Sequence, residues 1–238
     1  MARFFVPKEN IDADMLRITG EDVLHITKVL RMREGDTFTA CDGEKTDYTC
    51  KLLSADKTVV VAKILEKTEN TAEPKVHITL YQGIPKATKF DYIVQKCVEI
   101  GVCRIVPMKT DRVVKSGDSK TARLSKISLE AAKQSGRGIV PEIGEPFSFR
   151  EAVLKAKEAD LALFPYELET EFTLKKALRD KTPKSVSVLI GPEGGFSDEE
   201  SEFAKENGLL VVTLGKRILR TETAGPVTCG NILYEMEE

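Results

Sequence analysis

Two short segments of this chain combine glycine with charged side chains directly after an apolar run. The first, Val188–Ser197 (VLIGPEGGFS), predicts a buried strand, a glycine turn and the start of a helix. In open α/β sheets ligands bind at the carboxyl ends of strands, and glycine lets them approach the backbone closely. The segment lacks the motifs of phosphate loops and dinucleotide sites, and Glu193 would repel phosphate. It therefore favours a neutral or cationic ligand, with a tight structural turn as the alternative.

The second segment, Leu214–Ala224 (LGKRILRTETA), also leaves an apolar run through glycine and leads into a helix. Arg217, Arg220 and Glu222 lie within six residues of one another. The planar guanidinium of Arg220 suits carbonyl oxygens or a phosphate. We interpret this loop as a second part of the same ligand site. An ion pair that only holds the loop in place is the alternative.

Strands and helices alternate after residue 75, which predicts a mostly parallel sheet covered by helices on both faces. The expected strands are Val76–Gln82, Cys103–Pro107, Asp160–Phe164, Val186–Ile190 and Leu209–Leu214. Thr88 is expected to cap a helix with apolar residues at helical spacing that ends before Gly101. Further helices are expected at about Lys120–Ser135, at Thr170–Leu178 and after a capping box at Ser197–Glu200.

The first 65 residues instead predict short strands, as in a small β-barrel, with one helix at about Glu21–Met32. The expected strands are Phe4–Val6, Leu16–Ile18, Thr37–Ala40, Tyr48–Leu53 and Val59–Leu65. Residues Glu66–Pro74 carry almost nothing apolar, so we place a linker and a domain boundary there. The two expected domains are therefore 1–72 and 73–238.

Positive charge is concentrated in the middle of the chain. The whole chain of 238 residues has a net charge of −2, whereas residues 86–137 hold 12 Lys and Arg against 5 Asp and Glu, a net charge of +7. Such a local cationic block suits a polyanion such as RNA, which these side chains would contact mainly at phosphates. Solvated helix faces explain the same charges equally well.

Several function classes are disfavoured. The sequence has no apolar run near the roughly 20 residues that span a bilayer, and its amino terminus is too short for a signal peptide. Five cysteines without a Cys-x-x-Cys pair, together with two histidines, argue against disulfides and zinc and favour a reducing cytoplasm. We find no Ser-His-Asp set, metal cluster or paired carboxylates, so hydrolases are disfavoured, and the lone His25 is more simply a packed or capping residue.

The motifs in their order resemble the RsmE family, 16S ribosomal RNA methyltransferases of the SPOUT class. Gly191–Ser197 and the pattern Leu214-Gly…Ile218–Ala224 carry most of the resemblance. Further matches run along the whole chain: Arg3–Val6, His25 with Val29–Arg31, Gly35–Asp36, Lys89 with Gln95–Lys96 and Glu99, and Glu130–Ala132 with Gln134, Arg137 and Pro141. Gly225-Pro226 in the final helix departs from the family pattern.

This resemblance implies a PUA-like barrel that helps to hold RNA, followed by a trefoil-knotted α/β domain. It implies a cytoplasmic homodimer that binds S-adenosylmethionine in the knot loops, needs no metal or membrane, and methylates N3 of a uridine in the decoding region of 16S ribosomal RNA. The nearest alternative is a SPOUT enzyme that modifies another RNA atom, such as a ribose 2′-hydroxyl. A non-catalytic RNA-binding factor for ribosome assembly is the alternative from another class.

The resemblance also implies roles for individual residues. Arg220 is expected to stabilise negative charge on the uracil carbonyl oxygens, and Glu222 either to accept the N3 proton or to orient Arg220. Cofactor contacts are expected from Phe164, Pro165, Tyr166, Glu167, Gly191, Pro192, Glu193, Gly194, Leu214, Gly215, Ile218, Leu219, Arg220 and Thr223. RNA contacts are expected from Arg3, His25, Arg31, Arg33, Lys86, Lys89, Arg112, Arg123, Gln134 and Arg137.

Overall fold

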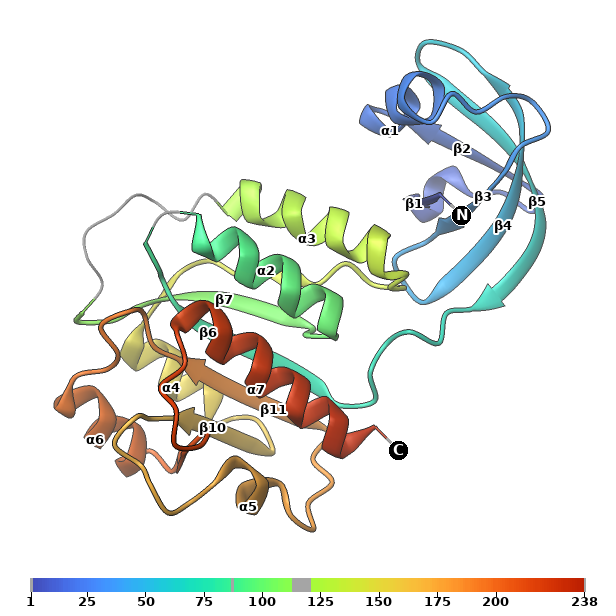
Figure 1. The fold of residues 1–238 in the computed structure, drawn as a ribbon. Helices are drawn as coiled ribbons and strands as arrows, with labels where there is room; N and C mark the ends of the chain where they lie inside the picture. The colour runs from blue at the N-terminus through green and yellow to red at the C-terminus, as the bar shows by residue number, and fades with distance from the viewer. Residues whose placement is uncertain (1, 87, 113–120, 238) are drawn as a thin grey trace. The chain divides into compact units, whose positions relative to one another are not determined.

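The computed structural model describes residues 2–86, 88–112 and 121–237, and the chain divides into two compact units (Figure 1). The first unit contains residues 1–73 together with residues 132–140. The second contains residues 74–131 and 141–238. The expected domains, 1–72 and 73–238, left the segment 132–140 in the second domain, whereas the contacts of this segment group it with the first unit.

The first unit is built on one five-stranded sheet. Its strand order is β1 (Arg3–Phe5), β3 (Thr37–Cys41), β4 (Thr46–Ala55), β5 (Val59–Glu69) and β2 (Met15–Thr19). Neighbouring strands are antiparallel except for the parallel pair β1–β3. All five strands lie where the sequence predicts them. Alternate residues such as Leu16, Phe38 and Leu52 are buried and form the core of the unit.

The helical segment between β2 and β3 differs from the single helix expected at Glu21–Met32. An α-helical turn, α1 (Glu21–Leu24), continues as a π-helical turn, η2 (His25–Val29). Arg31 then adopts a φ of 54°, a left-handed conformation that ends the helix. β-Branched residues at Ile26, Thr27 and Val29 also lower the helical preference of this stretch. A short 3₁₀ turn, η1 (Lys8–Asn10), precedes β2.

The polar segment that we expected to be a solvated linker is bound within the first unit. Strand β5 continues through it to Glu69. The Asn70 amide then donates to Asp47 Oδ2 and to the Gly136 carbonyl, both at 2.9 Å. Next, the Glu73 carboxylate accepts from Arg137 Nη2 at 2.6 Å, and both side chains are buried. The low apolar content here therefore reflects an exposed strand end, together with buried polar contacts at Asn70 and Glu73, and not a free linker.

The second unit contains a sheet in which every observed strand pair is parallel. Its main strand order is β12 (Leu210–Val212), β10 (Leu161–Pro165), β11 (Ser185–Ile190), β6 (His77–Gly83), β7 (Arg104–Lys109) and β8 (Glu142–Ile143). A short strand, β9 (Phe147–Ser148), also pairs with β7. The predicted parallel α/β sheet is therefore confirmed.

Helices connect these strands, and their observed first residues and N-caps can be compared with those that the sequence predicts. The helices are α2 (Lys89–Ile100), α3 (Thr121–Ser135), α4 (Phe149–Ala156), α5 (Leu174–Leu178), α6 (Asp198–Glu206) and α7 (Thr221–Met236). The capping box at Ser197 and Glu200 is confirmed. Helix α5 begins after Thr173, whose hydroxyl caps it, and not at Thr170. Thr88 precedes α2 but makes no side-chain cap, and Lys120 lies outside the described residues. Helix α4 and its capping box at Ser148 were not predicted from the sequence.

The two faces of the second sheet are covered by different helices. In β6, Leu80 and Gln82 lie under Gly225 of α7, whereas Tyr81 belongs to the core beneath α4. Figure 1 shows α2 and α7 side by side, with α4 on the other side of the sheet. Pro226 lies within α7, beyond the first turn. Within the described residues, no helix combines the length and apolarity needed to cross a membrane.

The buried ion pair between Glu73 and Arg137 gives a stability prediction for the first unit. Glu73 also accepts hydrogen bonds from the Gly138 and Ile139 amides at 2.9 and 3.0 Å. Glu73→Ala would remove the carboxylate that faces the buried Arg137 guanidinium and accepts from two amides, so we expect a loss of about 3–5 kcal/mol in the free energy of unfolding. Urea denaturation measures it. Lys155→Ala, in an exposed pair with Glu158, is the control and should change stability by less than about 0.5 kcal/mol.

The same pair should also make stability depend on pH. Although burial raises the pKa of Glu73, Arg137 and the two amides outweigh it and hold that pKa below its usual value. A carboxyl with a lowered folded pKa stabilises the fold above its unfolded pKa and loses this contribution as pH falls through the folded value. The wild-type chain should therefore lose more stability between pH 5 and acid than Glu73→Ala does. Equal losses would contradict this assignment.

Candidate functional site

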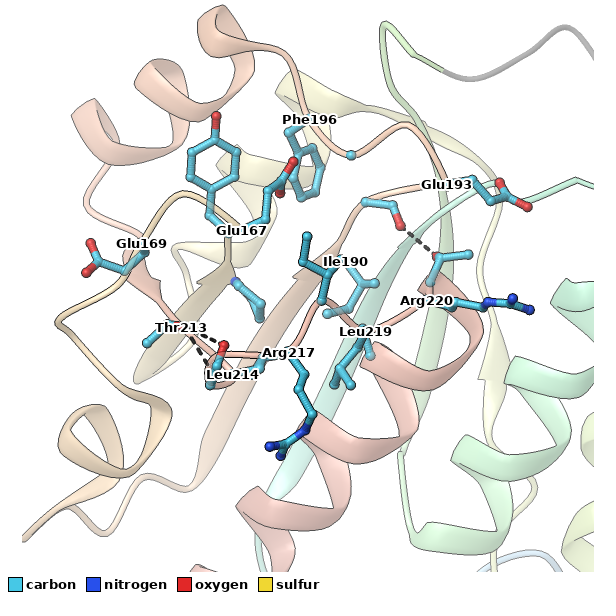
Figure 2. Close-up of a pocket in the computed structure, with 18 of the residues that line it drawn as sticks. Glu167, Glu169, Ile190, Glu193, Phe196, Thr213, Leu214, Arg217, Leu219 and Arg220 are labelled. Atoms are coloured by element: carbon cyan, nitrogen blue, oxygen red, sulfur yellow. Dashed lines mark hydrogen bonds between the residues drawn. The ribbon is translucent and has the colours of Figure 1, made fainter.

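A cavity of about 750 Å³ opens at the carboxyl ends of β10, β11 and β12 in the second unit (Figure 2). This volume is within the range of roughly 300–1,000 Å³ that is usual for small-molecule sites. Three segments line it, at 165–173, 190–196 and 213–224, together with Lys89 from the start of α2. Both glycine loops that the sequence singled out therefore contribute to one cavity.

The first glycine loop leaves β11 and turns tightly above the sheet. It approaches β6 so closely that a Cβ atom on Gly83 would lie 2.6 Å from the Pro192 nitrogen, so only glycine fits there. Gly195 has a φ of 66°, and a Cβ atom on it would lie 2.7 Å from Glu167 Oε1. The loop therefore needs glycine at Gly195 for its backbone conformation, whereas the Glu167 carboxylate is the end of a flexible side chain that can move aside.

A buried threonine joins the two glycine loops. The Thr221 hydroxyl donates to the Gly191 carbonyl at 2.7 Å and accepts from Gln82 Nε2 at 2.9 Å. Gln82 Nε2 also donates to the Gly83 carbonyl at 3.0 Å. The end of β6, the turn after β11 and the start of α7 are thus held together beneath the cavity.

The second glycine loop presents backbone groups to the cavity. At its start, Thr213 Oγ1 accepts from the Gly215 amide at 3.2 Å and fixes the turn. Among the described residues, the backbone amides and carbonyls of 216–219 make no hydrogen bond. Residues 216–218 are exposed and Leu219 is half-buried, so these groups pair with solvent or with a ligand. Ile190, Leu214 and Leu219 add apolar surface beside them.

Aromatic rings support the cavity from the side of β10. The Phe164 and Phe196 rings lie 4.4 Å apart between centroids, and Phe164 is fully buried. Phe196 reaches the cavity wall, whereas Phe164 lies behind it. Tyr166 and Glu167 follow β10 and line the same wall. Figure 2 shows Glu167 close to Phe196.

Charged side chains meet at the edge of the cavity next to α2. Lys89 Nζ lies 3.1 Å from Glu193 Oε1 and 3.2 Å from Glu222 Oε2. Arg220, at the N-cap position of α7, is exposed and extends on the same side as Glu193 in Figure 2. Glu222 Oε2 is buried and accepts no well-aligned hydrogen bond among the described residues, so its contact with Lys89 is mainly electrostatic.

These contacts keep both carboxylates ionised. Burial raises the pKa of Glu193, but hydrogen bonds from its own amide and from Lys89 outweigh burial and lower the pKa below its usual value. The pKa of Glu222 is also lowered, by its own backbone amide at the start of α7 and then by Lys89. The contacts of Lys89 with the Glu193 and Glu222 carboxylates raise the pKa of Lys89 in turn. This edge of the cavity therefore holds two anions and one cation that faces both.

Most of the residues expected to bind a cofactor lie together around the cavity. Those that line it are Pro165, Tyr166, Glu167, Gly191, Pro192, Glu193, Gly194, Leu214, Gly215, Ile218, Leu219 and Arg220. Phe164 does not line it, because its ring is buried behind Phe196. Thr223 does not line it either, because it lies on the exposed side of the first turn of α7. Glu222 lies beside the cavity and contacts Lys89.

The residues expected to contact RNA are divided between the two units. Arg3, His25, Arg31, Arg33, Gln134 and Arg137 belong to the first unit, and Lys86, Lys89, Arg112 and Arg123 to the second. Four of the first-unit residues remain accessible or partly so, with His25 packed edge-on against Phe4. Arg137 is 2 % exposed and paired with Glu73, so it is a structural residue and not an RNA contact. Arg3 donates to Asp47 at 2.9 Å and is largely buried.

In the second unit, most of the residues expected to contact RNA already make contacts within the chain. Arg123 pairs with Asp91, Arg112 donates to the Gly194 carbonyl at 3.0 Å, and Lys89 faces two carboxylates. Lys86 is exposed. The sequence did not single out Thr221 and Gln82, which join the loops beneath the cavity, or Ile190, which lines it. All three lie at strand or helix ends. Their only sequence signal was a polar Gln at the end of an apolar strand.

Comparison with known proteins identifies this architecture. Residues 72–233 match the family model of an RNA methyltransferase domain, and residues 18–65 match that of an RNA methyltransferase PUA domain. Ribosomal RNA small subunit methyltransferase E of Bacillus subtilis is 35 % identical over all of this chain and 98 % of its own length. The chain belongs to the ribosomal RNA small subunit methyltransferase E family. The resemblance to the RsmE family is therefore confirmed, as is a PUA-like domain followed by an α/β methyltransferase domain.

Other members of the RsmE family agree with this assignment. The enzyme of Mesomycoplasma hyopneumoniae is 34 % identical over 94 % of this chain and 95 % of its own length. A crystal structure of the Neisseria gonorrhoeae enzyme bound to S-adenosyl methionine is 33 % identical and has a TM-score of 0.87 over 98 % of this chain and 96 % of that one. This chain therefore shares its fold with a relative whose structure contains S-adenosyl methionine.

The Thr221 hydroxyl gives a prediction for the floor of the site. Thr221→Val keeps the side-chain shape but leaves the buried Gly191 carbonyl and Gln82 amide without this partner, so we expect a loss of about 1–3 kcal/mol in the free energy of unfolding. Thr221→Ser keeps the hydroxyl and should lose less than Thr221→Val. Urea denaturation of both variants measures this. Equal stability of wild type and Thr221→Val would show that the hydroxyl does not join the loops.

Proposed function

We propose that this chain transfers a methyl group from S-adenosylmethionine to N3 of a uridine in the decoding region of small-subunit (16S) ribosomal RNA. The observation that carries the proposal is the cavity where the two glycine loops meet, with unpaired backbone groups at 216–219 and carboxylates at its edge. The cofactor-bound relative and the family of the chain support the same reaction. The cytoplasm, where ribosomal RNA is made into subunits, is the proposed location.

The chemistry of the cavity fits this cofactor. A purine ring needs an apolar slot and backbone donors and acceptors at its edge, which Ile190, Leu214 and the backbone of 216–219 offer. A sulfonium and an ammonium need nearby anions, which Glu167, Glu169 and Glu193 offer. When bound, the cofactor supplies an electrophilic methyl group. The role of the chain is to hold the acceptor nitrogen in line with it, which is a positioning task.

Arg220 is proposed to act on the substrate base. Loss of the N3 proton spreads negative charge over the two uracil carbonyl oxygens, and a guanidinium can donate two parallel hydrogen bonds to such oxygens. Arg220 lines the cavity, is exposed, and has no carboxylate within ion-pair distance among the described residues. Its donors are therefore available to a ligand, unlike those of the paired Arg123 and Arg137.

Glu222 is proposed to orient charges and not to act as the general base. A carboxylate whose pKa is lowered is a poor acceptor for the proton of a weak acid such as the uracil imide. Glu222 already faces Lys89 at 3.2 Å, and its charge lies next to Arg220 in the chain. Of the two roles that the sequence left open for Glu222, the charges favour the second.

The rest of the family architecture is proposed for this chain by the same reasoning. The first unit would hold RNA through exposed cations such as Arg31 and Arg33. A homodimer would cover the exposed apolar side chains on and near α7: Tyr234 and Ile218 are 85 and 87 % exposed, and Tyr92 and Val227 are also exposed. The loops that line the cavity would carry the trefoil knot.

The experiment that tests the proposed function is methyl transfer from labelled S-adenosylmethionine to small ribosomal subunits that lack their modifications. We expect label in 3-methyluridine after digestion to nucleosides. Label in a 2′-O-methyl nucleoside would overturn the acceptor atom. Absence of label, together with binding of the cofactor in calorimetry, would overturn the proposed RNA substrate. Absence of cofactor binding would overturn the reaction itself.

The role of Arg220 gives a prediction about rate. Arg220→Ala removes a donor to charge that develops during the reaction, so the single-turnover rate should fall by roughly 10²–10³-fold. Cofactor binding should change little, because backbone groups make most of the proposed contacts. Arg179→Ala, an exposed arginine at the end of α5, is the control and should keep the wild-type rate. A loss of only a few-fold in Arg220→Ala would contradict the role of Arg220.

Glu222→Gln separates the two roles of that carboxylate in the same assay. Loss of a general base typically costs about 10²–10⁴-fold in rate, whereas loss of an orienting charge should cost less than about tenfold. We expect the smaller loss of rate in Glu222→Gln. In the wild-type chain, we expect a rate that does not rise as pH passes through the range in which carboxyl groups ionise. A loss above a hundredfold would restore the base assignment.

A further inference from the structure

One ammonium group holds two carboxylates that come from different loops of the site. Lys89 is the first residue of α2, Glu193 follows β11, and Glu222 lies in the first turn of α7. Lys89 Nζ is 3.1 and 3.2 Å from their carboxylate oxygens. The Lys86 amide also donates to both oxygens of Glu193, at 3.1 and 3.3 Å. Lys89 and Glu193 line the cavity, so this cluster is part of the ligand site.

One ammonium, that of Lys89, lies within ion-pair distance of both carboxylates, and Arg220 adds a weaker attraction at Glu222. Glu193 and Glu222 are both ionised, since their pKa values are lowered, and Lys89 is their one shared cation. A second cation that entered the cavity would therefore be attracted to the same two carboxylates. A sulfonium held beside these carboxylates by the rest of the cofactor repels the Lys89 ammonium and makes the potential there less negative, so the carboxylates hold Lys89 more weakly.

Of the three charged side chains in this cluster, Lys89 is the one that can move away most easily. Its side chain is 34 % exposed, against 27 and 19 % for the carboxylates of Glu193 and Glu222. Ion pairs with this much solvent contact contribute little to stability, and the lysine stem has four rotatable carbons. Release of the ammonium to solvent therefore costs little. The carboxylates, in contrast, are held by backbone amides at Lys86 and at the start of α7.

We propose that the charge of the bound cofactor determines whether Lys89 pairs with Glu193 and Glu222 or with an RNA phosphate. This inference rests on the proposed function. With no cation in the cavity, Lys89 stays on Glu193 and Glu222. With a sulfonium beside these carboxylates, Lys89 leaves them and pairs with an RNA phosphate. The expected RNA contact at Lys89 is therefore made only while the methyl donor is bound.

The reaction itself would reset this contact. Methyl transfer breaks the sulfur–carbon bond with its electron pair left on sulfur, forms the nitrogen–carbon bond with the electron pair on N3, and releases the N3 proton to solvent. The positive charge beside Glu193 and Glu222 is then gone. Lys89 can return to the two carboxylates and give up the phosphate, which favours release of the methylated RNA. Because linkage is reciprocal, RNA should also favour the charged cofactor over the neutral product by the same factor.

The test compares RNA affinity in the presence of two non-reacting cofactor analogues. Sinefungin carries a charged amine where the sulfonium would be, and S-adenosylhomocysteine is a neutral thioether. With in-vitro transcribed 16S ribosomal RNA as the probe, the wild-type chain should bind at least about fivefold more tightly with sinefungin than with S-adenosylhomocysteine, both saturating. Lys89→Met should bind RNA equally with both, at the wild-type affinity for S-adenosylhomocysteine. Lys89→Arg should retain a difference.

The matched control is Lys96→Met. Lys96 lies on the same helix, with 36 % of its side chain exposed, and pairs with Glu99 at 2.8 Å outside the cavity. This variant should keep the wild-type difference between the analogues. A second measurement needs no variant: with sinefungin, the slope of log affinity against log salt concentration should steepen by about 0.7–0.9, the value for one added phosphate contact.

Three results would overturn the inference. These are an unchanged analogue difference in Lys89→Met, an equal loss of RNA affinity with both analogues, and equal salt slopes in the wild-type chain. The second result would make Lys89 a permanent phosphate contact. Calorimetry separates these failures from failure of the proposed function, since a chain that bound neither analogue would not be a methyltransferase of this kind.

Discussion

The site depends on the parallel direction of four neighbouring strands. In β10, β11, β6 and β12 every pairing runs the same way, so Ile190 lies beside Gln82 and Pro165 beside Val212. All the carboxyl ends therefore meet at one edge of the sheet, and the loops that follow them must share one space. If β11 ran in the opposite direction, its glycine turn would lie at the far edge, and no cavity would form from these loops.

Parallel strands also require long connections, so the loops of the site come from distant parts of the sequence. Hydrogen bonds below the cavity compensate for this distance. Thr221 and Gln82 are 139 positions apart and share one buried hydrogen bond, and Thr221 also holds Gly191. Beneath the cavity the Thr221 hydroxyl and Gln82 Nε2 are paired within the chain, whereas the buried Gln82 Oε1 has no partner among the described residues. The backbone of 216–219, on the cavity side, is left for a ligand. Hydrogen bonds within the chain thus fix the floor of the cavity, whereas the backbone groups on its wall can bind a ligand.

The sequence predicted features that depend on neighbours along the chain. Apolar runs located every strand of both sheets except the two-residue strands β8 and β9, and the glycine loops located most of the cavity wall. The capping box at Ser197 was readable because both partners lie within four residues. The π-helical turn at His25–Val29 was not readable, because its alternative, an ordinary helix, has almost the same pattern.

Ion-pair partners could not be predicted, because tertiary packing chooses them. Arg137 reads as one more basic residue at the end of a cationic helix, yet its partner Glu73 lies 64 positions away in a segment that reads as a linker. Arg3 and Asp47 are separated by 44 positions. In each case composition shows that a charge exists but not which charge it meets. The burial of both pairs follows from the fold alone.

This distinction changes how the positive block at residues 86–137 should be understood. Its net charge of +7 suggests a surface that attracts RNA at all times. In the structure, however, acids from outside this block also face its cations: Glu142 faces Arg104, Asp22 faces Lys133, Glu73 faces Arg137, and Glu193 and Glu222 face Lys89. Much of the charge is therefore balanced at short range, and attraction to a polyanion depends on which pairs open. A methyltransferase gains from such an arrangement, because an RNA held by permanently unpaired cations would leave slowly after methylation. Cations released only by the charged cofactor would bind the substrate and let the product go.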